Sequence, residues 1–238
     1  MASNRIVAPS LPISTTRAVV FAGDNVALAG QIDYPATRRP AGGYPLIFVL
    51  HHACCNTRED YVDYAQVALD KGFAVFRWDK RGTGHSGSSG RGSTTQDAVN
   101  AYETALSQPN INRKQTVILA VGAGTALLGS AFGLFARVQR PHGAILVANM
   151  LDDTEVLAID TQTLILLGEE DWNPVAIYGD AASAAHRQAY RYGAAFRLIC
   201  GADRLLMSLN SGSSTLHPDA RKAIGSWLNG LTHLSTSS

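Results

Sequence analysis

The chain has 238 residues, of which 46% are hydrophobic and 16% are charged, and this composition excludes a disordered polypeptide. The formal net charge is only +1, so electrostatic attraction to nucleic acid or to an anionic membrane surface is not expected. Three cysteines are too few for a disulfide framework, and we predict a reduced, cytoplasmic chain.

Apolar runs of strand length alternate with segments of helical period, which is typical of an α/β domain. The expected strands are Arg17–Ala22, Val26–Tyr34, Leu46–Leu50, Ala74–Trp78, Val117–Val121, Ala144–Ala148, Leu164–Leu167 and Phe196–Ile199. The expected helices are Arg58–Lys71, Thr95–Gln108, Thr125–Val138, Asp180–Tyr192 and Pro218–Leu228.

The order of these elements predicts the architecture of the sheet. The first two strands are joined by Gly23-Asp24-Asn25, a hairpin-like turn, so the sheet begins antiparallel. The later strands are separated by helices and are nearly all apolar, which predicts parallel pairing with both faces covered. We expect one domain over residues 17–238, preceded by an N-terminal extension of residues 1–16.

Two segments allow other interpretations. Residues 116–136 carry no charge and are long enough to span a membrane, but a β-rich half followed by a helical half favours a buried strand and helix. Gly82–Ser93 is rich in Gly and Ser, and we predict a mobile loop. It contains the pattern G-x-G-x-x-G, but no helix follows at once, so no nucleotide cofactor is predicted.

The strand Val117–Val121 leads through a glycine-rich turn into a helix. Small residues around a sharp strand-to-helix turn are typical of a nucleophile elbow, where the central residue faces a pocket. We place the centre of this elbow at Gly124. The N-terminus of the following helix presents N–H groups that have no intrahelical partner.

Four more segments carry a resemblance to a known family: VLHH (Val49–His52), FRWDKRGTGHSG (Phe76–Gly87), LILLGEEDWNPV (Leu164–Val175) and LICGAD (Leu198–Asp203). With the elbow, they make the chain from about Arg17 onward resemble the α/β-hydrolase fold, closest to small lid-less esterase- and acyl-peptidase-like members. The resemblance implies a doubly wound, mostly parallel eight-stranded sheet with antiparallel N-terminal strands and little or no lid. It also implies that Asp79 and Arg81 brace the loop after the fourth strand.

The resemblance further implies a catalytic triad, from which this chain departs. Asp171 matches the acid, but Gly124 stands at the predicted elbow centre in place of Ser, and Arg204 stands where a His is usual. The oxyanion turn reads His51-His52 instead of His-Gly. Glycine has no side chain that could form an acyl-enzyme, and a guanidinium with a pKa above about 12 is no general base.

We therefore predict a non-hydrolytic enzyme of the cyclase, isomerase or lyase type that acts on a small carbonyl-containing molecule, with no cofactor. The catalytic candidates are Asp171 as charge partner or base, Arg204 as anion clamp, and the amides of Gly124 and Thr125 as oxyanion donors. An Asp171–Arg204 ion pair is expected. The candidates for substrate binding are His51, His52, Ala53, Cys54, Ala123, Trp172 and His85.

Two other functions stay open at this point. One is a pseudoenzyme that binds a ligand in a vestigial pocket. The other is an esterase or thioesterase with a relocated nucleophile, Cys54 or Cys55, or a His in that role, assisted by His51, His52 or His85. A metal at this cluster is not predicted, because adjacent side chains point apart and no second ligand pair follows. The expected partner is a small molecule with a carbonyl or carboxylate, and a homodimer is left open.

Overall fold

The computed structural model describes residues 15–54, 56–209 and 215–234. Eight strands form one sheet: β1 (Thr15–Gly23), β2 (Val26–Tyr34), β3 (Tyr44–Leu50), β4 (Ala74–Trp78), β5 (Ile111–Val121), β6 (Gly143–Val147), β7 (Gln162–Gly168) and β8 (Ala194–Ile199). The α-helices are α1 (Val62–Asp70), α2 (Thr94–Leu106), α3 (Ala123–Gln139), α4 (Ala182–Ala189) and α5 (Pro218–Leu234). The short helices are η1 (Arg58–Tyr61), η2 (Glu155–Ala158) and the π-helical η3 (Ala176–Ala181).

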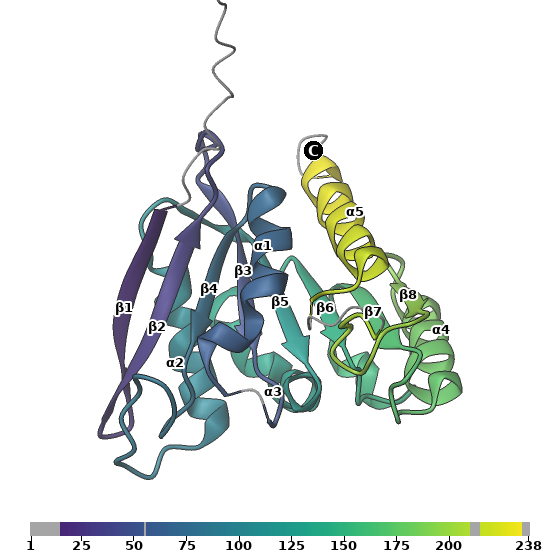
Figure 1. Cartoon of the computed structure of the whole chain (residues 1–238), viewed down its shortest axis with the longest axis horizontal. Coiled ribbons are helices and arrows are strands. Elements are labelled where there is room, and N and C mark those ends of the chain that lie inside the picture. Colours follow the sequence, from purple (N-terminus) through teal and green to yellow (C-terminus); the bar gives the residue numbers. More distant parts are fainter. Residues whose placement is uncertain (1–14, 55, 210–214, 235–238) are drawn as a thin grey trace, which may run out of the picture.

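The strand order is β1-β2-β4-β3-β5-β6-β7-β8. β1 pairs antiparallel with β2 through a two-residue turn, and β2 pairs antiparallel with β4. All the other pairs are parallel. The predicted fold class, a mostly parallel sheet with antiparallel N-terminal strands, is therefore confirmed (Figure 1).

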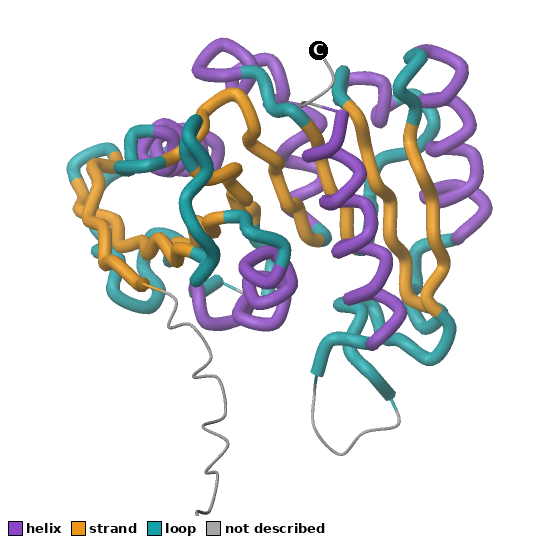
Figure 2. The backbone as a smooth tube through the Cα atoms, turned by 90° about the horizontal axis from the view of Figure 1, so that it is seen from above, coloured by secondary structure: helices purple, strands orange, loops and turns teal. Residues whose placement is uncertain are grey.

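Helices cover both faces of the sheet (Figure 2). Strand β3 shows why, because its side chains alternate between two separate cores. Leu46, Phe48 and Leu50 pack with α2 and α3, whereas Ile47 and Val49 pack with α1 and α5. A strand that is apolar on both faces needs a helix on each side, and this is the arrangement that the unbroken apolar runs predict.

The uncharged stretch of residues 116–136 forms the end of β5 and most of α3. Phe132 and Phe135 of this helix are buried in the core. None of the described helices combines the length and the apolar character that a membrane crossing needs.

The loop after β4 is held in place, so the prediction that Gly82–Ser93 is a mobile loop is not supported. Ser86 Oγ donates to Asp79 O at 2.7 Å, and Ser89 Oγ donates to Asn25 O at 2.8 Å. Arg81 reaches across the loop, donating to Asp24 O at 3.0 Å and pairing with Asp97 at 2.7 Å. The hydroxyl groups and the arginine supply the order that the glycines by themselves would not.

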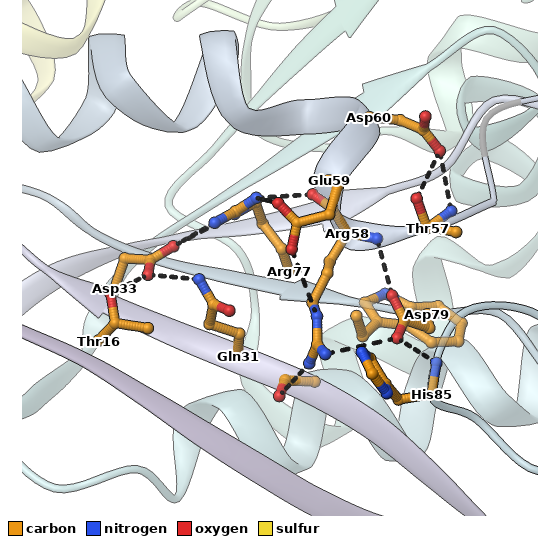
Figure 3. A network of polar contacts seen from close by, with 12 residues as sticks. Thr16, Gln31, Asp33, Thr57, Arg58, Glu59, Asp60, Arg77, Asp79 and His85 are labelled. Atoms are coloured by element: carbon orange, nitrogen blue, oxygen red, sulfur yellow. Dashed lines mark hydrogen bonds and ion pairs between the residues drawn. The ribbon is translucent and has the colours of Figure 1, made fainter.

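A polar network extends from the sheet to this loop (Figure 3). Asp79 is 1% exposed, and its carboxylate accepts from the N–H groups of Arg58 and His85, both at 2.9 Å. Arg77 pairs with Asp33 at 2.8 Å on the neighbouring strand. Asp79 thereby joins the start of η1 to the loop after β4, which is the bracing role expected of it.

Candidate active site

The turn between β5 and α3 is centred on Gly122. Its backbone angles are φ +52° and ψ −116°, a conformation that glycine adopts readily and other residues adopt with strain. Strand β5 ends at Val121 and α3 begins at Ala123, so this one residue makes the whole turn. The geometry is that of a nucleophile elbow with Gly122 at the position of the nucleophile.

The prediction that Gly124 is the elbow centre is therefore wrong. Gly124 lies in the first turn of α3, and a Cβ there would be 2.6 Å from Leu50 O, so glycine lets the helix approach the end of β3. Thr125 is also wrongly predicted as an oxyanion donor, because its N–H donates to Gly122 O at 2.8 Å. Its hydroxyl donates to the same carbonyl and accepts from Met150 N–H.

The ring of His52 fills the space in which an elbow side chain would lie. A Cβ built on Gly122 would overlap His52 Cδ2 and would lie 2.7 Å from its Nε2. The backbone N–H of His52 donates to the hydroxyl of Tyr61 at 2.6 Å, which fixes the loop after β3. Glycine at position 122 and the large side chain at position 52 are thus sterically complementary.

Asp171 and Arg204 form an ion pair beside this ring. Arg204 Nη1 lies 2.7 Å from Asp171 Oδ1, and the two side chains are 9% and 0% exposed, so the expected ion pair is confirmed. The guanidinium Cζ lies 4.0 Å from the centre of the Trp172 ring. Arg204 Nε lies 3.4 Å from His52 Nε2. The ion pair, the imidazole and the elbow therefore follow one another in a row.

Two turns after neighbouring strands present the ion pair. Asp203 Oδ1 accepts from two backbone N–H groups, both at 2.8 Å, and closes the tight turn that carries Arg204. This turn packs on Gly168 at the end of β7, where a Cβ would overlap Asp203 O. Asp171 follows that glycine, and its Oδ1 accepts from Asn173 N–H at 3.0 Å.

Burial perturbs both titratable groups of the row. It raises the pKa of Asp171, against the opposing effects of a backbone hydrogen bond and of the charge on Arg204. It lowers the pKa of His52, and the positive charges of Arg204 and Lys80 lower this pKa further. His52 is therefore a neutral imidazole at neutral pH.

A neutral imidazole has one lone pair and one N–H group. His52 is near two donors, Cys54 N–H at 3.0 Å from Nδ1 and Arg204 Nε at 3.4 Å from Nε2. It accepts from only one of them at a time. In one tautomer Nδ1 carries the lone pair and accepts from Cys54 N–H. In the other tautomer Nε2, the ring nitrogen next to the elbow, carries the lone pair and accepts from Arg204.

A cavity of about 250 Å³ lies next to the elbow, between the ends of β3 and β4 and the first turns of α2 and α3. Ala53 and Ala123 both line it. Ala123 is the first residue of α3, so its N–H has no intrahelical carbonyl partner. With His52 N–H engaged by Tyr61, we expect the amides of Ala53 and Ala123 to be the oxyanion donors.

The structure does not bring every predicted residue into this row. His51 lines the cavity and donates from Nε2 to Trp78 O at 2.6 Å. His85 is exposed on the loop after β4, and Cys54 has an exposed side chain. Cys55 lies outside the described residues. In the part of the chain that is described, no three His, Cys, Asp or Glu side chains are grouped as metal ligands.

Three residues of this site were not predicted from the sequence. Gly122 was detectable, since Ala120 and Gly124 are small residues at the right spacing around it. Lys80, which donates from Nζ to His52 O at 2.8 Å, and Tyr61 carry no sequence signal, because only the folded loops bring them to His52.

No protein-family model and no curated protein matches the sequence, but the fold is similar to that of solved structures. A dienelactone hydrolase-like promiscuous phosphotriesterase from metagenomic libraries has a TM-score of 0.66 at 14% identity and covers 93% of this chain and 98% of its own. An esterase of Pyrococcus furiosus has a TM-score of 0.67 at 10% identity, covering 92% and 91%. The esterase domain of a Rhodothermus marinus protein has a TM-score of 0.62 at 18% identity, covering 90% and 97%.

Proposed function

From the α/β-hydrolase fold of this chain and the residues at its elbow, we propose that the protein hydrolyses small esters, lactones or thioesters with water as the nucleophile. The observation that carries this proposal is the position of His52, whose imidazole lies where the elbow side chain would be. A base therefore stands at the place from which a hydrolase of this fold attacks the carbonyl.

The proposed reaction has two steps, and neither forms a covalent enzyme intermediate. The substrate carbonyl oxygen binds at the amides of Ala53 and Ala123, which stabilise the negative charge of the tetrahedral intermediate. His52 Nε2 takes a proton from water as the water oxygen bonds to the carbonyl carbon. The intermediate then breaks its bond to the leaving oxygen or sulfur, which takes the proton back from His52.

Arg204 and Asp171 act on His52 in this scheme. The Nε–H of Arg204 favours the tautomer with the lone pair on Nε2, and the reacting water replaces this long contact of 3.4 Å when His52 takes its proton. Its charge keeps the ring neutral before reaction and makes the imidazolium a stronger acid afterwards. Asp171 holds the guanidinium in place and offsets its charge, so that a protonated His52 does not face an unpaired cation.

The solved structures support a hydrolase through their names. Several of them are described as esterases, as an arylesterase, as a dienelactone hydrolase or as similar to one. Each is at most 18% identical to this chain, so their substrates suggest a class of reaction and nothing narrower.

Replacement of the proposed base tests the function directly. We expect the wild-type chain to hydrolyse phenyl butanoate above the buffer rate, and His52→Gln to lower kcat/KM by at least about 100-fold, the contribution of a general base. Cys54→Ser is the matched control in the same loop and keeps the rate. Loss of activity in Cys54→Ser with activity kept in His52→Gln would assign the nucleophile to the thiol instead.

The pH dependence of hydrolysis gives a second test. The lowered pKa of His52 keeps the base neutral into more acidic solution, so the acidic limb of kcat/KM lies below the value of about 6.5 of an ordinary histidine. The charge of Arg204 contributes to this lowering, so Arg204→Met moves the limb to higher pH. An acidic limb that stays in place in Arg204→Met contradicts the assignment of His52 as the base.

A second candidate function is a non-hydrolytic reaction, such as a cyclisation or isomerisation, on the same kind of carbonyl compound. Glycine at position 122 and arginine at position 204 favour it, since they leave the site rich in hydrogen-bond donors and without a side-chain nucleophile at the elbow. In the tautomer that accepts from Cys54 N–H, His52 Nε2–H adds another donor. A carbonyl compound that is converted without water uptake would favour this candidate.

A further inference from the structure

The cavity beside the elbow has walls that the proposed reaction does not use. Its volume is about 250 Å³, enough for a short carbon chain. One part of the wall is apolar and is formed by Leu50, Trp78, Ala98 and Leu127. Because Ala123 also lines the cavity, a molecule held there reaches the amide at which we place the reacting carbonyl.

The side chains that line this cavity carry a net positive charge. Lys80 is the one charged side chain among the described residues that line it, and no carboxylate is among them. Its Nζ donates to His52 O at 2.8 Å, which holds the ammonium group at the cavity wall. Helices α2 and α3 both begin at this wall, at Thr94 and Ala123, and their dipoles add positive potential. An anion is the group that such a wall attracts.

His51 gives a separate indication of a polar ligand. It is 4% exposed and lines the cavity, and its Nδ1 has no hydrogen-bond partner among the described residues. Its Nε2 is engaged by Trp78 O at 2.6 Å. Buried polar atoms are normally paired, so the unpaired Nδ1 of His51 indicates that a hydrogen-bond partner is missing here. Burial lowers the pKa of His51 to about 4, so the ring is neutral. Because Nε2 donates to Trp78 O, the unpaired Nδ1 is an acceptor, which a hydroxyl group or a bound water would satisfy.

We propose that this cavity binds a carboxylate, so that the substrate is a short ester, lactone or thioester that carries a second, ionised carboxyl group. The inference rests on the proposed function, since that function places the reacting carbonyl at Ala123. The apolar wall contacts the carbon chain between the two groups, and Lys80 pairs with the carboxylate.

Two compounds that cannot be hydrolysed test this subsite by calorimetry. Pentanoate and pentan-1-ol have the same number of carbons, and only pentanoate carries a carboxylate. We expect the wild-type chain to bind pentanoate at least about 10-fold tighter than pentan-1-ol, the effect of one partly buried charge pair. Lys80→Met removes this preference. Lys114→Met, which removes the same charge from an exposed position on β5, keeps it.

Three results would overturn the subsite: equal affinity for the two compounds, a preference that survives Lys80→Met, or the same loss in both lysine variants. Neither compound has a scissile bond, so these results are independent of catalysis. Hydrolysis of phenyl butanoate together with equal affinities would leave the proposed function standing and reject the carboxylate subsite.

Discussion

Gly122→Ala is expected to lower the free energy of unfolding by about 3 kcal/mol, the sum of backbone strain and overpacking. The strain arises because residue 122 has φ +52° and ψ −116°. The overpacking arises because the new Cβ overlaps the ring of His52. Denaturant titration followed by circular dichroism measures the change.

A double-mutant cycle separates these two causes. In a His52→Gly background the overlap is gone and only the strain is left, so Gly122→Ala should cost at least about 1 kcal/mol less there. Gly124→Ala is the matched control, because its Cβ meets the backbone at Leu50 O, 2.6 Å away, and truncation of His52 gives no relief. Equal costs of Gly122→Ala in both backgrounds would show that His52 does not occupy the elbow.

Arg204→Met is expected to lower the free energy of unfolding by about 3–5 kcal/mol, because it leaves a buried carboxylate without its cation. The side chain of Asp171 is 0% exposed, so water does not replace the lost partner. The double variant Arg204→Met with Asp171→Asn removes the charge as well and should recover part of the loss. If the double variant is no more stable than Arg204→Met alone, the cost lies in lost packing on Trp172 and not in the buried charge.

The same variant should change the dependence of stability on pH. The pKa of Asp171 is already raised by burial, and removal of Arg204 raises it further. A carboxyl group with a higher pKa in the folded state stabilises the fold at low pH, and this contribution is lost as the pH rises through the folded-state pKa. Arg204→Met should therefore lose more stability than the wild type as the pH rises above about 4, the ordinary pKa of an Asp carboxyl group. Parallel stability curves would contradict this explanation.

Much of the fold could be predicted from the sequence, because its signal is local. Strands β2 and β4 begin and end at the predicted residues, since apolar runs bounded by turn residues mark them. Strand β5 starts earlier than expected, at Ile111. Its first part contains the exposed residues Arg113 and Lys114. This part therefore lacks the apolar run from which the strand was predicted.

The candidate site was predicted in part. The Asp171–Arg204 ion pair follows from two turns that the resemblance aligns, and the structure contains it. The elbow was misplaced by two residues because Gly122 and Gly124 are the same residue type, and only the backbone angles distinguish them. The His52 ring lies at the elbow because of the conformation of the loop after β3 and because Gly122, far away in the sequence, has no side chain. The periodicity of apolar residues predicts neither feature.

The measurement that tests the account most directly is the intact mass of the chain during hydrolysis of phenyl butanoate. Water attack promoted by His52 predicts that product accumulates above the buffer rate while the mass of the protein stays unchanged. An increase in mass by one butanoyl group that disappears when substrate is exhausted would reveal a covalent intermediate and contradict the account. Product formation no faster than in buffer would also contradict it and would favour the non-hydrolytic candidate.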